Sequence, residues 1–558
     1  CEPGTLGPMT EKRPAPDLDV LAQIERRVLW LATRIVDAAN RRSLDNGDGP
    51  GRRAAEVKVG GHQASSASMV SIMTALWFAH IGGADKVAVK PHASPVYHAI
   101  KYLTGELDRS YLTTLRQRGG LQAYPSRTKD PDVADFSTGS VGLGAVAPLF
   151  SALTRRYTDH RFQDPSEHAR FVALVGDAEL DEGNVWEAVA EPAAEGLGNF
   201  TMVVDLNRQS LDRVIPNIAA ARLERFFHHA GWHVYEAKYG ARLRQAFTEP
   251  GGGALRRHID AMANEAYQQL FGLEGDLLRA TFLAGADLPV VRLTDNYDNT
   301  ELKALLTDLG GHDLGLLLDG FAECDRASDR PSVLFAYTVK GWGLPIAGDP
   351  LNHAALLTED QIDELRLLSG LTPESEWDRF DPESPAGRIC AAVGGDLNNP
   401  RPVPRPAVPV PAGARPAVTT GRVSTQEAFG RVMASLADVD GVAERLVTTA
   451  PDVSISTNLG GWINKVGVYA PTERDDHGGA DRLLKWAPSP TGQHIELGIS
   501  EMNLFMLLGQ LGLAHDHHGH HLLPVGAVYD PFVLRGLDAL IYSLYNGARF
   551  VVAGTPSG

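Results

Sequence analysis

Apolar and polar positions alternate along the chain in blocks whose spacing changes from helical to strand-like. Between Val20 and Asn40, apolar residues recur every three or four positions among Arg, Glu and Asp, which predicts an amphipathic helix with a packing role. Further on, short apolar runs end at Asp177, Asn207 and Lys340, with helical stretches between them. Such alternation predicts an α/β fold, with parallel strands, crossover helices and a ligand site at the carboxyl ends of the strands.

The segment 398–422 breaks this pattern, because it is rich in proline and has no periodicity. It is predicted to be a semi-rigid linker between a first domain over residues 19–397 and a second α/β domain over residues 423–558. The second domain stops directly after a strand and is therefore expected to be partial. Residues 1–18 are expected to form a tail, and the letters before Met9 are interpreted as foreign to the protein.

The composition is that of a globular protein and excludes several function classes. Hydrophobic residues make up 43% of the chain and charged residues 22%. No apolar run approaches the roughly 18 residues of a membrane-spanning helix, so no membrane role is expected. The net charge of −17 is spread along the chain, which disfavours nucleic acid as a partner. Cys1, Cys324 and Cys390 are too far apart to suggest a disulfide framework, so a cytoplasmic location is predicted.

Two strand ends carry oxygen ligands at a spacing that suits a magnesium ion. Asp177 follows one predicted strand, and Asn207 follows the next, 30 residues later. A diphosphate at such an edge needs a hard cation, and Mg²⁺ takes oxygen ligands in octahedral geometry. The candidate ligands are Asp177, the Asn207 amide and the main-chain carbonyl of Gln209, while Gly176 permits close backbone approach. The alternative is a common turn after one strand and an asparagine cap after the next.

The sequence around these candidate ligands resembles a family signature. GDAELDEG at 176–183 and DLNRQSLD at 205–212 resemble the signature of thiamine-diphosphate-dependent enzymes of the transketolase-like superfamily, especially the homodimeric pyruvate dehydrogenase decarboxylase subunit. Further stretches follow in the family's order: GGHQAS at 60–65, PHASPVYHAIKYLTGEL at 91–107, LQAYPS at 121–126, VGLG at 141–144, HHAGWHV at 228–234, GGHD at 310–313 and YTVKGWG at 337–343. One departure is Ala178, where the signature has glycine.

The resemblance implies a thiamine-diphosphate-binding fold, with thiamine diphosphate and Mg²⁺ as cofactors. Residues 19–397 are then the diphosphate-binding domain, and residues 423–558 are part of the pyrimidine-binding domain. Glu501 is implied to hydrogen-bond the pyrimidine ring and drive cofactor activation, with Phe532 stacked on that ring. The residues implied to lie against the cofactor are Gly142, Leu143, Gly176, Asp177, Ala178, Glu179, Asn207 and Phe532.

Several histidines are placed by the same resemblance. His62, His92 and His353 are implied to transfer protons and stabilise an oxyanion in the substrate funnel. For each one, the alternative is a surface or hydrogen-bonded core residue. Ser126 stands where the family usually has a substrate-binding histidine, which leaves substrate choice open. The run HDHHGHH at 515–521 is interpreted as a solvated loop rather than a metal site, because it has no fixed ligand spacing.

Two activities are compatible with the resemblance. In the first, a 2-oxo acid, by default pyruvate, is decarboxylated and a two-carbon acyl unit passes to a lipoyl carrier. In the second, a split transketolase-like enzyme moves a two-carbon ketol or glycolyl unit from a ketose phosphate to a lipoyl or acyl carrier protein. An inactive scaffold subunit is a third reading, which the retained site residues disfavour. A homodimer, or a heterotetramer with a second chain that supplies the missing C-terminal part, is expected.

Overall fold

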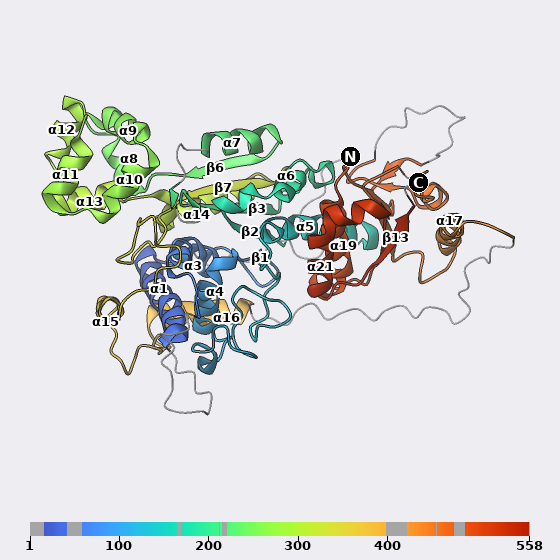
Figure 1. The fold of residues 1–558 in the computed structure, drawn as a ribbon, viewed down its shortest axis with the longest axis horizontal. Helices are drawn as coiled ribbons and strands as arrows, with labels where there is room; N and C mark the ends of the chain where they lie inside the picture. Colours follow the sequence, from blue (N-terminus) through green and yellow to red (C-terminus); the bar gives the residue numbers. More distant parts are fainter. Residues whose placement is uncertain are drawn as a thin grey trace.

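The computed structural model describes residues 16–41, 59–163, 169–210, 213–214, 220–397, 421–453, 455–473 and 486–556. The predicted tail and the predicted linker lie outside these residues, except for positions 16–18 and 421–422. Figure 1 shows two parts built around separate sheets, one near the middle of the molecule and one in the orange and red end of the chain. In the described ranges, no helix is both long enough and apolar enough to cross a membrane.

The first sheet has five strands in the order β1-β2-β3-β7-β6, and all neighbouring strands run parallel. The strands are β1 (Lys86–Ala88), β2 (Phe171–Gly176), β3 (Phe200–Leu206), β7 (Ser332–Tyr337) and β6 (His233–Ala237). Every residue of β2 and β7 is buried, as expected for parallel strands covered on both faces. The predicted α/β fold is confirmed, and the carboxyl ends of β2, β3 and β7 lie at one edge.

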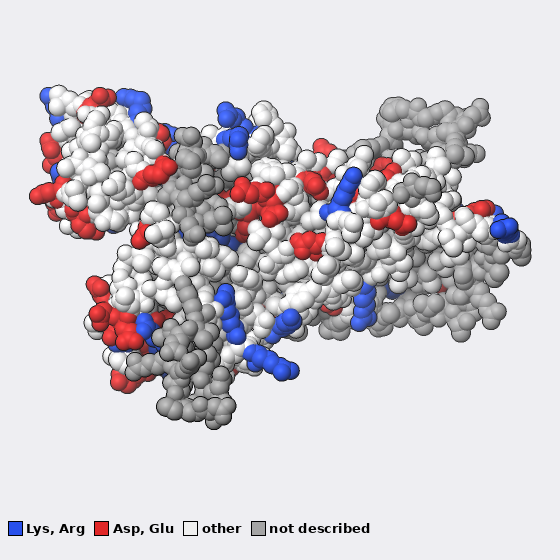
Figure 2. All heavy atoms as spheres, viewed as in Figure 1, with Lys and Arg blue, Asp and Glu red and all other residues white. Residues whose placement is uncertain are grey.

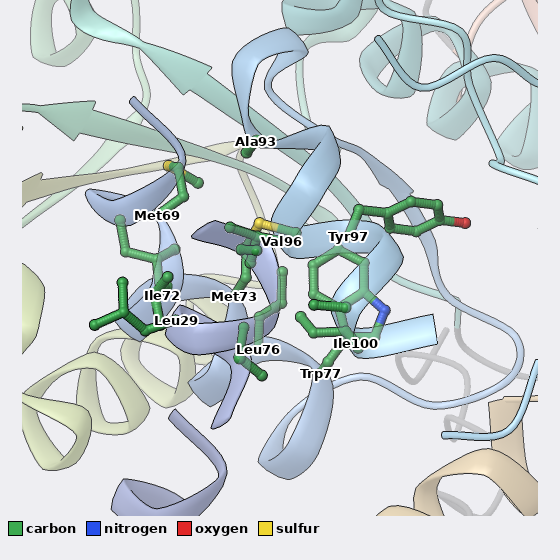
Figure 3. Close-up of a cluster of buried hydrophobic side chains, with 14 of the residues drawn as sticks. Leu29, Met69, Ile72, Met73, Leu76, Trp77, Ala93, Val96, Tyr97 and Ile100 are labelled. Carbon is green, nitrogen blue, oxygen red and sulfur yellow. The ribbon is translucent and has the colours of Figure 1, made fainter. Parts of the chain in front are cut away.

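Helices cover both faces of this sheet. Val172 and Leu174 of β2 belong to the core on one face, whereas Ala173 and Val175 belong to the core on the other. The first core contains side chains of α1 (Leu18–Arg41), α3 (Val70–Ala79), α4 (Ser94–Leu103), α14 (Leu314–Arg326) and α16 (Pro385–Leu397). Figure 3 shows side chains of α3 and α4 meeting in this core. The helix predicted from Val20 is confirmed as α1.

A separate helical lobe lies between β6 and β7 in the sequence, and Figure 1 shows it in green at one end of the molecule. Its helices are α8 (Ala241–Ala246), α9 (Gly252–Ala261), α10 (Asn264–Gln269), α11 (Gly275–Leu283), α12 (Leu288–Thr294) and α13 (Asn299–Leu306). The lobe has its own hydrophobic core, which includes Leu255, Phe282 and Leu302. This lobe was not predicted, because helices of six to ten residues are too short to show a clear apolar periodicity.

The second sheet has six parallel strands in the order β10-β9-β11-β8-β12-β13. The strands are β8 (Leu446–Ala450), β9 (Val468–Tyr469), β10 (Pro488–Ser489), β11 (His494–Glu496), β12 (Leu523–Tyr529) and β13 (Val551–Thr555). The helices around it are α17 (Thr425–Leu436), α18 (Gly460–Val466), α19 (Glu501–Gly512), α20 (Ala514–His518) and α21 (Leu537–Tyr545). These strands and helices give the second part of the chain an α/β architecture as well.

The two sheets are joined by a shared core. Helix α5 (Leu143–Phe162) packs on the first sheet, and its Phe150 lies in one hydrophobic cluster with Leu504 and Leu508 of α19. Residues 143–162 and 501–512 therefore pack together although the predicted linker separates them in sequence. The cysteines of the described chain, Cys324 and Cys390, are both free and buried.

The histidine run does not form the predicted solvated loop. Its first part belongs to α20, and the side chains of His517, His518 and His520 are buried. The His520 ring stacks on Phe162 at 4.4 Å between centroids, and Arg127 Nη1 lies 2.9 Å from His517 Nε2. The prediction was wrong because the contacts that bury these rings come from α5 and from the loop before it, far away in the sequence. In the described chain, the groups of residues close enough to hold a metal ion do not include this run.

Candidate functional site

The candidate site begins where β2 and β3 end. In the parallel register, Gly176 pairs with Asp205, so the residues that follow each strand emerge next to each other. Asp177 Oδ2 accepts a hydrogen bond of 2.7 Å from the main-chain N–H of Arg208, and Oδ1 accepts one of 2.9 Å from Ala178. The carboxylate of Asp177, after β2, is thereby hydrogen-bonded to the segment that follows β3.

Asn207 has a defined side-chain orientation. Its Nδ2 donates to Asp205 Oδ2 at 3.3 Å, and its Oδ1 accepts from the main-chain N–H of Gln209 at 3.0 Å. Arg208 between them has a φ of 61°, a left-handed conformation that side chains other than glycine seldom adopt. Such outliers cluster at functional sites. In this turn, the N–H of Arg208 donates to the Asp177 side chain, and the N–H of Gln209 donates to the Asn207 side chain.

The glycine loop before α5 meets the turn after β2. Glu179 Oε1 accepts from the Gly176 N–H at 2.9 Å, and Oε2 lies 3.5 Å from the Gly142 N–H. Gly142 has a φ of 84°, which favours glycine, and Leu143 follows it as the first residue of α5. The cofactor contacts implied at 142–143 and at 176–179 therefore lie at one place in the fold.

Ala178 causes no backbone strain at this turn. Residues 177–181 form a short 3₁₀ helix, and Ala178 is absent from the described residues with positive φ. The backbone here does not need glycine.

A buried ion pair, which the sequence did not predict, lies directly beneath this turn. Lys90 Nζ lies 2.6 Å from Asp205 Oδ2, and both side chains are buried. A methyl group built on Gly176 would come within 3.0 Å of Lys90 Cε, so the lysine lies against the turn itself. The only available signal was a lysine just before the PHASP stretch, and an isolated lysine there indicates nothing by itself.

These groups shift one another's protonation. Burial is the main cause that raises the pKa of Asp177 to about 7, and the nearby carboxylate of Asp205 adds to it. Burial also raises the pKa of Glu179. Burial opposes the ionisation of Asp205, but the ammonium of Lys90 outweighs it and lowers the pKa of that carboxyl. For Lys90, burial is outweighed in the same way by Asp205, and its pKa is raised.

The three predicted histidines are brought together beside this site. The rings of His62 and His92 stack with centroids 4.0 Å apart, and the His353 ring lies 4.7 Å from that of His62. Lys340 Nζ lies 3.0 Å from His353 Nδ1. The Tyr124 ring stacks on His92 at 5.6 Å, a neighbour that sequence analysis did not single out.

The environment keeps two of these rings neutral. Burial lowers the pKa of His62, and burial together with neighbouring His62 and Lys90 lowers the pKa of His92 to about 2. The three imidazoles have ligand-type nitrogens within 4.8 Å of one another, a spacing that would suit a metal ion. Lys90, Lys340 and the guanidinium of Arg116 add positive charge nearby, however, which favours an anion at this position instead.

Ser126 is buried and hydrogen-bonds residues from both parts of the chain. Its Oγ lies 2.8 Å from the hydroxyl of Tyr545 in α21, and its N–H donates to Asp130 Oδ2 at 2.7 Å. His98 lies beside this loop, and its Nδ1 donates a hydrogen bond of 2.8 Å to Asp132 Oδ2. The serine thus links the first part of the chain to the second.

Glu501 and Phe532 lie in the second part of the chain. Glu501 is the first residue of α19 and is buried, and the helix is capped by Ser500, whose Oγ accepts from the Asn503 N–H at 3.0 Å. The guanidinium of Arg535 lies 3.5 Å from Glu501 and stacks over the Phe532 ring at 4.1 Å. In the described part of the chain, no hydrogen bond or ion pair joins Glu501 or Phe532 to the cluster around Asp177.

Comparison with known proteins gives matches to a family model and to curated relatives. A family model described as 1-deoxy-D-xylulose-5-phosphate synthase matches residues 54–274, a range that contains His62, His92, Asp177 and Asn207. The pyruvate dehydrogenase E1 component of Corynebacterium glutamicum is 27% identical over 97% of this chain and 61% of its own length. The E1 component of Escherichia coli K12 is 23% identical over 98% of this chain and 64% of its own length.

Solved structures share the fold. Transketolase from Leishmania mexicana aligns with a TM-score of 0.64 over 96% of this chain and 68% of its own, at 16% identity. Transketolase from Campylobacter jejuni aligns with a TM-score of 0.62 over 96% of this chain and 69% of its own, at 15% identity. Together these matches support a relationship between this chain and the thiamine-diphosphate-dependent transketolase-like superfamily. The proteins it matches are enzymes, and the chain spans less than two thirds of the length of these curated E1 relatives.

Proposed function

We propose that the edge formed by β2 and β3 binds Mg²⁺ and the diphosphate of thiamine diphosphate. The protein ligands of the metal would be Asp177, the Asn207 amide oxygen and the main-chain oxygen of Gln209. The residues fit this role because Mg²⁺ prefers oxygen ligands, and three buried carboxylates gather here around one ammonium group. The Glu179 carboxylate accepts hydrogen bonds from the N–H groups of Gly142 and Gly176, and it thereby holds the glycine loop against the turn where the diphosphate would lie.

The reaction proposed first is decarboxylation of a 2-oxo acid, with pyruvate as the default substrate, and transfer of the two-carbon acyl unit to a lipoyl carrier. Bound thiamine diphosphate supplies the electron sink that this bond cleavage requires. The single observation that carries the proposal is the histidine cluster beside the Asp177 turn. The rings of His62 and His92, whose pKa values are lowered, are hydrogen-bonding groups, and Lys340 next to His353 provides a positive charge to orient a substrate carboxylate.

The second candidate is transfer of a two-carbon ketol or glycolyl unit from a ketose phosphate to a lipoyl or acyl carrier protein. It is supported by the same basic groups, because a phosphate suits Lys340 and Arg116 at least as well as a carboxylate does. The fold shared with transketolases agrees with either activity.

An exposed apolar surface on and beside α21 suits contact with a second copy of the chain. Apolar side chains are exposed on one face of α21 and beside it: Ile499, Leu534, Leu537, Ile541 and Leu544. In Figure 2, most of the surface over α21 is white, so few charged side chains lie on it. Glu501, the first residue of α19, lies 3.5 Å from the guanidinium of Arg535, which follows Leu534 in the chain. We infer that a second copy covers the face and that Glu501 and Phe532 of one copy complete the site of the other, in a homodimer or in a heterotetramer with a second chain.

The experiment is a turnover assay with thiamine diphosphate and Mg²⁺, offering either pyruvate or a ketose phosphate together with a lipoyl acceptor, with and without a co-encoded partner chain. Release of carbon dioxide from pyruvate would support the first reaction. Consumption of the ketose phosphate without carbon dioxide would support the second. Failure of the protein to bind thiamine diphosphate at all would overturn both.

A further inference from the structure

The buried pair of Lys90 and Asp205 supplies none of the metal ligands proposed above, yet Asp205 contacts the proposed ligand Asn207. Asp205 is the last but one residue of β3, and Lys90 follows β1, with β2 between the two strands. The side chain of Lys90 therefore crosses beneath the end of β2, which explains its close approach to Gly176. A lysine held there without a partner would be costly to bury, so the pair forms as a unit.

The carboxylate of Asp205 accepts hydrogen bonds from four side chains. Its Oδ2 accepts from Lys90 Nζ at 2.6 Å, from Ser68 Oγ at 2.6 Å and from Asn207 Nδ2 at 3.3 Å, and its Oδ1 accepts from Thr338 Oγ1. An ionised carboxylate can only accept hydrogen bonds. The amide of Asn207 must therefore turn its NH₂ group toward Asp205, which leaves its carbonyl oxygen on the other side. That oxygen is the atom assigned above as a metal ligand.

We propose that Lys90 and Asp205 are positioning residues that orient the Asn207 amide for metal binding, an inference that rests on the proposed function. Asp205 dictates which end of the amide faces away from it. The positive charge of Lys90 stabilises the ionised carboxylate of Asp205 at this buried position. Neither residue needs to touch the metal for this role.

The test measures the affinity of the full chain for thiamine diphosphate in saturating Mg²⁺ by titration calorimetry. Lys90→Met and Asp205→Asn are each expected to weaken binding about 10-fold or more, as for other groups that orient metal ligands. Lys90→Gln keeps a hydrogen-bond donor and is expected to lose less than Lys90→Met. It also serves as the second variant if Lys90→Met does not fold.

A double-mutant comparison separates positioning from a general structural effect. If the pair acts through Asn207, then Lys90→Met and Asp205→Asn should each weaken binding no more than about twofold further in an Asn207→Ala background. Lys86→Met is the matched control, because it removes a buried lysine of the same segment that pairs with Asp135 at 3.2 Å instead. Its affinity for the cofactor should match that of the wild type.

Two outcomes would overturn the inference and leave the proposed function intact. One is wild-type affinity in both Lys90→Met and Asp205→Asn. The other is a loss that is undiminished when Asn207 is already alanine. Absence of binding by the wild-type protein would instead refute the proposed function, and the inference would fall with it.

Discussion

Glu501 is the residue whose environment most clearly separates a catalytic role from a structural one. A glutamate that merely favours the start of a helix is usually exposed, whereas Glu501 is buried and the cap of α19 is provided by Ser500. We expect Glu501→Gln to retain thiamine diphosphate binding but to slow hydrogen–deuterium exchange at the reactive carbon of the cofactor by about 100-fold or more, the range typical of lost acid–base catalysis. Exchange followed by proton NMR measures this.

Glu496→Gln is the control for this experiment. Glu496 lies five residues earlier and is exposed, so its substitution should leave exchange unchanged. Normal exchange in the Glu501→Gln protein would show that another group activates the cofactor.

At the level of elements, a pair of carboxyl groups couples the helix α7 (Ala220–His229) to strand β6. Burial is the main cause that raises the pKa of Glu224 to about 8, and its hydrogen bond with Glu236 adds to the shift. Because the folded-state pKa lies above the unfolded value, protonated Glu224 stabilises the fold at low pH. That stability is lost as the pH rises from about 4.5 to about 8.

Glu224→Gln removes this titration. The difference in Tm between the variant and the wild type should therefore become more positive as the pH is raised from 5 to about 8.5. Thermal unfolding followed by circular dichroism at several pH values measures it. Glu265→Gln, at an exposed position of α10, should give a difference that does not change with pH. A flat difference for Glu224→Gln would mean that the two carboxyl groups do not share a proton.

At the level of the whole molecule, the apolar face of α21 determines the expected assembly. Leu537, Ile541 and Leu544 are spaced by four and three residues, so they line one side of the helix, and each is at least 40% exposed. Ile541→Asp is expected to raise the dissociation constant of the dimer by at least about 30-fold, because it would bury a charge at the centre of the contact. Analytical ultracentrifugation over a concentration series measures this.

Leu368→Asp provides the matched control for assembly. Leu368 is 74% exposed on α15 (Glu359–Leu368), away from α21, and its substitution should leave the dissociation constant unchanged. A stable dimer in the Ile541→Asp protein would mean that copies associate through another surface. A wild-type protein that is monomeric at all concentrations would assign the apolar face to a different partner chain.

The sequence by itself determined the features that depend on neighbours along the chain. The helix α1 follows from apolar spacing, and β2, β3 and β7 follow from short apolar runs that end in polar residues. The nearness of Asp177 and Asn207 was also predictable, because parallel strands that are adjacent in a sheet end at the same edge. The motifs were enough to predict the superfamily.

Only the tertiary structure decided which distant residues meet. Lys90 and Asp205 are 115 residues apart, and His62 and His353 are 291 apart, so no local pattern links them. The burial of the histidines at 517–520 and the shared core of α5 and α19 likewise depend on how helices pack across the two sheets. Local periodicity records which face of an element is apolar, but the identity of the surface that covers that face depends on the packing of the entire chain.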